Sequence, residues 1–372
     1  MNNRERTLAI MNYQPYDRLP IVHFGYWSQT LEKWADEGHI SHELAAAQRD
    51  GNAADQALDA IFGWDFNWSR SKGGNANLLP QFERKVLKEH EDGGREVLNE
   101  DGAIILEKPD AISIPSEIDH LLKDRHAWEE LYLPKLQWSM KRISPELMHP
   151  PASEAERSLP NCLWVGSLLG TIRNWIGVVN LSYMMADDPQ LLDEIIQTVA
   201  DLTYQNIQTI LTANDDFDYA HYWEDISFKN GPLVSPRFFR SKIGPYYQRN
   251  TELLHAHNIH LTSLDSDGNI DKLVPIWLEN GVNIMFPIEV GTWQASVAPW
   301  RAQYGRELRG VGGMNKVVFS HDRASIDREV ERLKPLVDLG GYIPCPDHRI
   351  APDGKFELVQ YYVERMRKEF GG

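Results

Sequence analysis

Two carboxylates stand close together in the segment Asp265-Ser266-Asp267-Gly268. An apolar run at 258–264 precedes the segment and predicts a buried strand, and residues 270–278 predict a helix with Asn269 as its N-cap. Ligands and reacting groups of α/β proteins collect at such strand ends. Carboxylates this close repel each other unless a cation or a shared proton relieves them. The pair therefore indicates acid chemistry or cation binding, although Asp and Gly are also ordinary turn residues.

The chain from Leu163 onward alternates between strand-like runs and helical stretches, which predicts parallel strands joined by crossover helices. With the strand ending at His23 and one further early strand, the alternation gives eight units and hence an α/β fold of the (β/α)8 TIM-barrel type. A doubly wound open sheet is the alternative, but neither GxGxxG nor GxxxxGK[ST] follows any strand. The predicted strands are 163–166, 219–223, 259–264, 282–286, 308–311 and 341–344, and the helices include 189–212, 236–257 and 323–339.

The first part of the chain predicts an N-terminal helical extension followed by a small β insertion. Helices are expected at 3–11, 28–34 with Ser28 as its cap, and 41–62 with an interruption near Gly51. Two Asp-Gly turns separate β-type runs and predict a three-stranded meander over 82–108. The 372 residues suffice for one barrel, so we expect a single domain over 1–372 with the meander inserted.

The residues that follow the predicted strands are mostly polar or aromatic, and in a barrel these residues build the site. Asp265, Asp267 and His348 could offer two oxygens and one nitrogen to zinc or another divalent metal, leaving a position open for substrate. The alternative is that these groups satisfy one another, because no HxH, HExxH or CxxC spacing supports a metal. We also regard Asp265 and Asp267 as catalytic candidates.

Two further residues are catalytic candidates. Glu224 follows the strand that ends at Trp223, and Arg173 could hold a carboxylate or phosphate as a fork. An ion pair of Arg173 with Glu224 or Asp225 is the alternative. Aromatic side chains could line a flat apolar cavity or simply fill the core. The candidate substrate-binding residues are His23, Tyr26, Trp27, Trp175, Trp223, Lys229, Asn230 and Glu289.

The chain is acidic, with 38 Lys and Arg against 54 Asp and Glu and a net charge of −16. This charge disfavours sequence-independent binding to nucleic acid and attachment to anionic membranes, and it is compatible with a homodimer. No apolar run approaches membrane-spanning length, and residues 1–6 do not resemble a signal peptide. The two cysteines, Cys162 and Cys345, form no disulfide framework, so a cytoplasmic location is expected and Cys345 is expected to be an ordinary buried thiol.

Several motifs are spread over most of the chain: Arg18-Leu19-Pro20-Ile21, His23-Phe24-Gly25-Tyr26-Trp27, 170–177, Trp223-Glu224-Asp225, 229–232, 265–269, Pro287-Ile288-Glu289, Gly312-Gly313 and 340–344. Together they resemble the motifs of the uroporphyrinogen decarboxylase superfamily. The resemblance implies a distorted (β/α)8 barrel with one of two activities. One is cofactor-free decarboxylation of a tetrapyrrole, and the other is zinc-dependent methyl transfer between a small substrate and a corrinoid protein.

The sequence departs from the pattern of both branches. The decarboxylases carry an arginine-rich segment after the first strand, whereas residues 23–29 contain no arginine. The methyltransferases use a His-x-Cys pair and a later Cys, and by position Asp265 and Asp267 replace the pair while His348 falls near the last Cys. This change from soft sulfur to hard oxygen disfavours thiol activation. A methyl ether, a phenol or a quaternary amine suits an aromatic, acidic pocket better.

The resemblance therefore implies a corrinoid-dependent methyltransferase, a demethylase that moves a methyl group from a small methoxylated or N-methylated substrate to a corrinoid. The corrinoid (cobalamin) would be carried by a partner protein. One alternative is a decarboxylase or lyase of a small carboxylic acid, with Arg173 and Lys229 holding carboxylates. The other is a ligand-binding member without catalysis, which the missing His-x-Cys pair favours.

Overall fold

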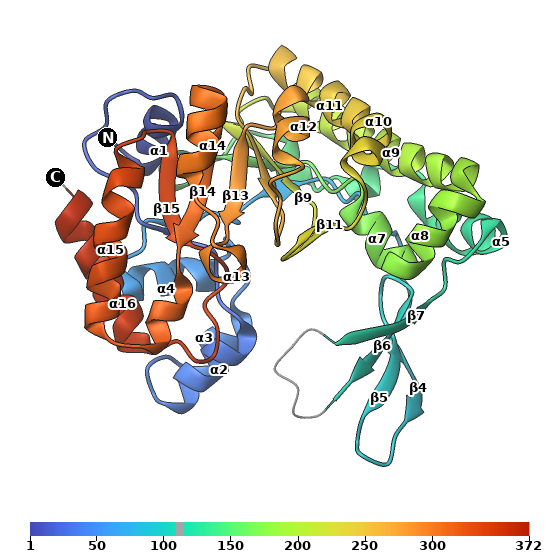
Figure 1. Cartoon of the computed structure of the whole chain (residues 1–372), viewed down its shortest axis with the longest axis horizontal. Coiled ribbons are helices and arrows are strands. Elements are labelled where there is room, and N and C mark those ends of the chain that lie inside the picture. Colours follow the sequence, from blue (N-terminus) through green and yellow to red (C-terminus); the bar gives the residue numbers. More distant parts are fainter. Residues whose placement is uncertain (109–114, 372) are drawn as a thin grey trace.

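Seven parallel strands form the central sheet of the protein, in the order β15-β14-β13-β12-β9-β8-β3. The computed structural model describes residues 1–108 and 115–371. Strands β9, β12, β13, β14 and β15 match runs expected from the sequence, and their residues are almost all buried because helices cover the sheet (Figure 1). The bounds are β3 Lys72–Gly73, β8 Cys162–Trp164, β9 Tyr219–Trp223, β12 Thr262–Asp265, β13 Ile284–Ile288, β14 Arg309–Met314 and β15 Tyr342–Pro346.

Two short strands bring the two ends of this sheet together. Strand β1 (Val22–His23) pairs in parallel with β2 (Phe66–Asn67), and the chain that continues from β2 becomes β3 and pairs with β8. Beyond β1, Tyr26 forms a parallel bridge with Ile350, which follows β15. Eight strand positions thus follow one another in chain order, and the fold is the expected barrel-type α/β architecture with irregular pairing around β1 and β2.

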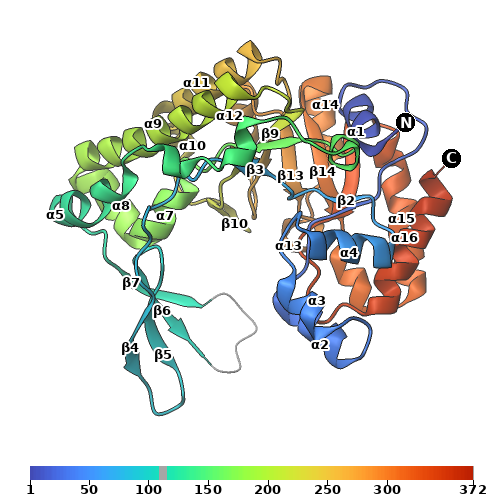
Figure 2. The ribbon, with the colours of Figure 1, turned by 180° about the vertical axis from the view of Figure 1, so that it is seen from behind.

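Helices connect the strands and lie outside them (Figures 1 and 2). The longest, α9, begins where the Asp188 side chain accepts a hydrogen bond from the Leu191 N–H, with Pro189 in the first turn. Its bounds and those of the others are α1 Asn3–Met11, α2 Ser28–Asp36, α3 His42–Ala47, α4 Ala53–Phe62, α5 Arg125–Ala127, α6 Glu154–Arg157, α7 Gly170–Ile176, α8 Val178–Asp187, α9 Pro189–Ala213, α10 Pro236–Lys242, α11 Gly244–Ala256, α12 Val274–Glu279, α13 Val290–Trp293, α14 Val297–Tyr304, α15 Arg323–Val337 and α16 Phe356–Phe370. A π-helical turn spans Trp128–Tyr132, and 3₁₀ turns span Leu133–Leu136, Met140–Arg142, Pro145–Met148, Gly305–Glu307 and Lys316–Ser320.

Three helix boundaries differ from the sequence-based predictions. Helix α12 begins at Val274 and not after Asn269, whose side chain accepts a hydrogen bond from the Asp271 N–H within a turn. Pro275 favours the later start because its ring fits the first helical turn, where no N–H is needed. The stretch 236–257 is divided into α10 and α11 for the same reason, with Pro245 at the start of α11. Ser28 is the first residue of α2 and not its cap.

A four-stranded antiparallel sheet projects from the body of the molecule (Figures 1 and 2). We call it the insertion sheet. The three strands expected within 82–108 are present, and β7, which lies after the expected segment, adds a fourth. Its sequence, Ser-Glu-Ile-Asp-His, is too polar to signal a strand by itself. Bounds are β4 Lys85–Glu89, β5 Arg95–Leu98, β6 Ala103–Glu107 and β7 Ser116–His120; a separate hairpin joins β10 Ser227–Phe228 to β11 Gly231–Pro232.

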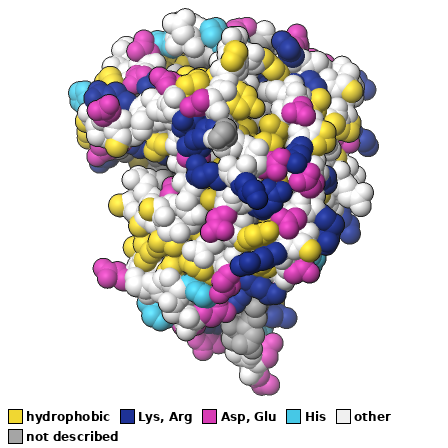
Figure 3. All heavy atoms as spheres, turned by 90° about the vertical axis from the view of Figure 1, so that its left-hand side faces the viewer, with side chains coloured by type: hydrophobic (Ala, Val, Ile, Leu, Met, Phe, Trp, Pro, Cys, Tyr) yellow, Lys and Arg dark blue, Asp and Glu magenta, His cyan; other side chains and the backbone are white. Residues whose placement is uncertain are grey.

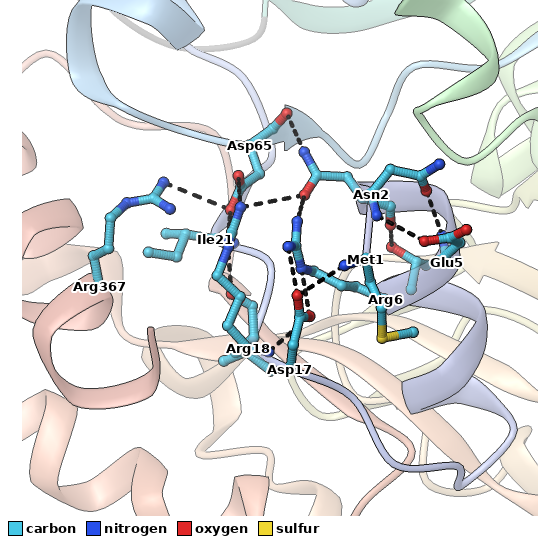
Figure 4. A network of polar contacts seen from close by, with 12 residues as sticks. Met1, Asn2, Glu5, Arg6, Asp17, Arg18, Ile21, Asp65 and Arg367 are labelled. Carbon is cyan, nitrogen blue, oxygen red and sulfur yellow. Dashed lines mark hydrogen bonds and ion pairs between the residues drawn. The ribbon is translucent and has the colours of Figure 1, made fainter. Parts of the chain in front are cut away.

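The N-terminal extension is anchored to the start of β1 by an ion-pair network (Figure 4). The Arg18 guanidinium donates two hydrogen bonds of 2.7 Å to Asp65, and Asp65 also accepts the Ile21 N–H at 2.8 Å. Arg6 donates to Asp17 at 2.7 and 2.8 Å. Asp65 therefore fixes the chain just before the residues that approach the barrel mouth.

The face formed by α15 and α16 carries charges of both signs side by side (Figure 3). Lys334 lies 2.6 Å from Glu369 and Arg365 lies 2.9 Å from Asp327, in each case between the two helices. Such exposed pairs contribute little to stability. Among the described residues, none of the helices is both long and apolar enough to cross a membrane.

Candidate functional site

A pocket of about 300 Å³ lies at the carboxyl ends of the barrel strands, and we call it the central pocket. The arrowheads of β13, β14 and β15 in Figure 1 point to the same side of the molecule as α2, α3 and the insertion sheet. Carboxyl ends of parallel strands meet on one rim, which is why residues from β1, β8, β9, β12 and β15 converge here. The lining residues are Phe24, Asp50, Ser69, Trp164, His221, Trp223, Asp265, Asp267, His348 and Arg349.

The three residues expected to converge do line this pocket together. Asp265 ends β12, Asp267 follows two residues later, and His348 Nε2 lies 3.3 Å from Asp267 Oδ2. The backbone turns sharply directly after Asp267, at Gly268, whose φ is +83° and whose missing Cβ would lie 2.5 Å from the Ser227 carbonyl oxygen. Only glycine fits that turn, so Gly268 has a structural role in presenting the two acids.

The pKa of the Asp265 carboxyl is raised by its surroundings. Burial raises its pKa well above the ordinary value, and the neighbouring charges of Asp267 and Asp225 raise it further, whereas Arg349 opposes the shift. The raised pKa favours the protonated form of Asp265, and a protonated carboxyl is a proton donor. His221, on the neighbouring strand β9, has its pKa lowered to about 3 by burial and stays neutral. The pocket thus combines a carboxyl of raised pKa with the aromatic side chains of Phe24, Trp164 and Trp223.

Arg349 and Asp50 belong to the pocket although the sequence did not single them out. Arg349 Nη1 donates to Asp50 Oδ1 at 3.1 Å. A Cβ at Gly25 would lie 2.6 Å from Arg349 Nη1, so the absence of a side chain there admits the guanidinium. Asp50 lies between α3 and α4, far from any strand end in the sequence. Asp50 reaches the central pocket only because α3 and α4 lie beside the barrel mouth.

A second hollow of about 360 Å³, the side pocket, shares Asp267 and His348 with the central pocket. Lys316 Nζ donates to the Arg349 carbonyl at 3.0 Å, and burial lowers the pKa of this lysine. Glu289 accepts hydrogen bonds from Thr292 Oγ1 at 2.9 Å and from the Gly268 N–H at 2.5 Å, and burial raises its pKa. The other residues that line the side pocket are Gly291, Val317 and Asp347.

Glu224 lies outside the central pocket. Its side chain is fully buried, and its carboxylate accepts the N–H groups of Leu169 at 3.0 Å and Gly170 at 2.6 Å. The Tyr247 hydroxyl donates to it at 2.8 Å. These contacts satisfy the free N–H groups at the start of α7. Glu224 therefore anchors a helix and does not contact a ligand, which corrects its assignment as a catalytic candidate.

Arg173 was expected to hold a carboxylate or phosphate of the substrate, but its guanidinium contacts Asp225 instead. Its Nη2 donates to the Asp225 carbonyl at 2.8 Å and lies 3.6 Å from Asp225 Oδ2, and its Nη1 lies 3.9 Å from Glu117 in the insertion sheet. Asp225 Oδ1 in turn accepts the Asp267 N–H at 3.3 Å. The arginine thus reaches the acid pair through Asp225, and the ion-pair alternative is the one observed.

The expected aromatic residues divide between the pocket and the core. Trp223 lines the central pocket, and the Trp27 ring lies 6.0 Å from the His348 ring. Tyr26 and Trp175 are 3% and 0% exposed and pack in the hydrophobic core, so neither contacts a ligand in the central pocket. Trp164 lines the pocket but was not among the expected residues. Its place at the end of β8 was the signal that could have identified it.

The remaining expected residues lie apart from the central pocket. His23 is fully buried, with Nε2 2.7 Å from Asp59 Oδ1 and Nδ1 accepting the Gly25 N–H at 2.9 Å. It therefore fixes the backbone after β1. Lys229 and Asn230 are exposed at the turn between β10 and β11. Neither lines the central or the side pocket.

The donor set does not fit a resident metal ion. Among residues 1–108 and 115–371, no group of three or more His, Cys, Asp or Glu side chains is placed to hold one. Asp267 Oδ2 lies 3.3 Å from His348 Nε2, and this contact already engages both side chains. Cys345 is fully buried, and burial raises its pKa well above the ordinary value. No chemical step is therefore assigned to a metal held by these residues.

Comparison with known proteins identifies relatives by fold. No protein-family model matches the sequence, and no curated protein matches it. A methyltransferase from Methanosarcina mazei aligns with 99% of this chain and 99% of its own at 14% identity and a TM-score of 0.59. A B12-independent methionine synthase from Shewanella sp. W3-18-1, in complex with selenomethionine, aligns with 95% of this chain and 98% of its own at 11% identity and a TM-score of 0.50. The chain has the fold of these two enzymes over nearly its whole length, which is the barrel that the superfamily resemblance implied.

Proposed function

We propose that the protein is a methyltransferase that moves a methyl group from a small methoxylated or N-methylated molecule to a corrinoid carried by a partner protein. The observation that carries this proposal is the buried Asp265 carboxyl, whose pKa burial raises, in a pocket at the barrel mouth that Phe24, Trp164 and Trp223 also line. The shared fold with a methyltransferase and a methionine synthase supports the same class of reaction. Fold alone does not fix a reaction, so the pocket chemistry carries the argument.

The pocket provides what breaking a methyl ether requires. The C–O bond breaks with both electrons staying on oxygen, the methyl carbon bonds to the nucleophilic Co(I) of the acceptor, and Asp265 gives its proton to the leaving oxygen. A neutral acid placed at the leaving group accelerates such a step by about 10²–10⁴-fold. A quaternary ammonium substrate leaves as a neutral amine without this proton, so a protonated Asp265 favours methoxylated substrates.

The other residues of the pocket would bind and orient the substrate. Phe24, Trp164 and Trp223 offer flat apolar surface against which an aromatic ring can pack. His348 lies beside Asp267 and between the two pockets, where it can hold a polar substituent. Orientation of the methyl carbon toward the acceptor lowers the entropic part of the barrier.

The direct test is methylation of free cob(I)alamin by the purified protein with a panel of methoxyarenes and methylamines, followed by the absorbance of methylcobalamin. Turnover of a methoxyarene that is lost in Asp265→Asn supports the proposal. Absence of turnover across the panel counts against it. Release of carbon dioxide from small carboxylic acids would instead identify a decarboxylase. Ligand binding that Asp265→Asn leaves unchanged, without turnover, would identify a binding protein.

A further inference from the structure

Three arginines gather around one tyrosine ring at the end of the barrel opposite the pockets. The guanidinium carbons of Arg301, Arg306 and Arg309 lie 5.0, 5.0 and 5.5 Å from the centre of the Tyr13 ring. We call these three residues the arginine cluster. Arg301 lies in the last turn of α14, and Arg309 begins β14. The cluster therefore lies at the amino ends of the strands, away from the arrowheads that mark the pocket rim (Figure 1).

The Tyr13 ring is fixed in its position. Its backbone adopts a φ of +57°, which only a few per cent of residues other than glycine adopt. Its hydroxyl is shared between the carbonyls of Arg306 and Leu308, at 2.9 and 3.1 Å. A Cβ at Gly341 would lie 2.5 Å from Tyr13 Cζ, so the absence of a side chain there admits the ring. The ring is thus a rigid surface over which the guanidinium groups lie in cation–π contact.

The positive charge of the cluster has no acidic partner. Among residues 1–108 and 115–371, no carboxylate oxygen lies within 4.0 Å of a guanidinium nitrogen of these arginines. Burial lowers the pKa of Arg301 and of Arg309, and the charge of a neighbouring arginine lowers it further in each case. Three cations have therefore been brought together in a chain that has 54 Asp and Glu residues to offset its 38 Lys and Arg residues. A bound anion would relieve their repulsion.

Part of the hydrogen-bonding capacity of the cluster is unused. Arg301 donates to the carbonyls of Leu339 at 2.9 Å and Leu308 at 2.8 Å, but its Nε is buried without a partner among the described residues. Arg309 also donates to backbone carbonyls. Arg306 is exposed, and within the described part of the chain its guanidinium forms no hydrogen bond or ion pair. The planar fork of Arg306 is therefore available to a ligand.

We propose that the arginine cluster binds a small phosphate-bearing anion. A phosphate group accepts two parallel hydrogen bonds from one guanidinium, which the free fork of Arg306 can donate. Arg301 and Arg309 supply fixed positive charge beside it. The net charge of −16 disfavours a polyanionic macromolecule at this surface, so the ligand is a small molecule. This inference does not depend on the proposed methyl transfer.

Isothermal titration calorimetry with sodium pyrophosphate tests the proposal on the full chain. The unmodified protein should bind pyrophosphate, and Arg306→Gln should weaken binding about tenfold or more because charge-assisted bidentate hydrogen bonds are lost. Arg306→Lys should recover part of the affinity, since it keeps the charge but not the fork. The matched control is Arg240→Gln, which removes an exposed arginine that lies 3.0 Å from Glu279. It should bind within about twofold of the unmodified protein.

Thermal melting gives an independent measurement. Pyrophosphate should raise the melting temperature of the unmodified protein and of Arg240→Gln more than sodium chloride does at the same ionic strength, because a ligand of the folded state stabilises it. Arg306→Gln should lose this difference while melting normally without ligand. Equal effects of pyrophosphate and chloride on the unmodified protein would overturn the proposal. Equal pyrophosphate affinity of Arg306→Gln and Arg240→Gln would also overturn it.

Discussion

His348 Nε2 lies 3.3 Å from Asp267 Oδ2, and this pair separates the central pocket from the side pocket. The two residues follow different strands, β12 and β15, and meet because both strands end on the same rim. His348 Nδ1 and Asp267 Oδ1 are buried and have no hydrogen-bond partner among the described residues. Buried polar atoms of this kind are costly unless a ligand or water completes them, so the pair is poised to bind a polar substrate group.

Asp267→Asn should reduce activity far more than stability. The substitution weakens the contact with His348 and removes a charge beside Asp265, so we expect a loss of about 10²-fold or more in kcat/KM, as for other groups that act on proton transfer. Asp267 is 37% exposed and outside the core, so the free energy of unfolding should change by less than about 1 kcal/mol. Parallel measurement of turnover and of urea denaturation checks both parts. A variant that unfolds readily yet retains its specific activity would contradict the assignment.

Asp265→Asn should abolish turnover of methoxyarenes and raise stability at neutral and alkaline pH. The folded protein raises the pKa of Asp265, so the folded state binds more protons than the unfolded state above about pH 4 and loses stability as pH rises through the folded pKa. Asparagine has no proton to lose. Each unit of pKa difference corresponds to about 1.4 kcal/mol.

Melting temperatures of the unmodified protein and of Asp265→Asn between pH 4 and 9 measure this effect. The advantage of the variant should grow with pH and vanish near pH 4. The activity of the unmodified protein should fall on the alkaline side as Asp265 ionises. A constant difference in melting temperature across the range would show that Asp265 is not the titrating group.

Arg173→Gln should lower activity by moving Asp225 and, through it, the Asp267 N–H. We expect a loss of about tenfold with little change in the melting temperature, since positioning errors near a reacting group are costly. Arg173→Lys should recover part of the activity because it keeps the positive charge beside Asp225. Lys242→Gln, which breaks a comparable ion pair with Asp193 at 2.7 Å away from the pocket, is the control. A shift in the alkaline limb of the pH profile in Arg173→Gln alone would separate positioning from a general structural effect.

Asp65→Asn should destabilise the protein by about 2–4 kcal/mol, because it leaves Arg18 without its partner in a largely buried place. Although burial opposes it, hydrogen bonds from Arg18 and Ile21 hold the pKa of Asp65 below its ordinary value. This stability is present above the unfolded pKa, about 4, and is lost as pH falls through the folded pKa. Asp17→Asn, whose exposed carboxylate pairs with Arg6, should cost clearly less stability than Asp65→Asn. Equal losses in urea denaturation of the two variants would contradict this account.

The sequence by itself determined the strand ends that carry chemistry. Alternation of strands and helices located β9 and β12, and a barrel then required Asp265, Asp267 and His348 to meet on one rim. Local pattern is sufficient here because the strand period and the crossover connection are properties of short segments. For the same reason the three strands within 82–108 were predictable from turn residues and apolar runs.

Only the tertiary structure decided which polar residues near those ends face a ligand. Glu224 and His23 stand at strand ends as Asp265 does, but neither side chain faces the pocket. Glu224 accepts hydrogen bonds from N–H groups at the start of α7, and His23 hydrogen-bonds to Asp59. Arg349 and Asp50 enter the pocket because α3 and α4 pack beside the mouth. The direction of a side chain depends on neighbours distant in sequence, which compete for its hydrogen bonds, and no local pattern encodes that competition.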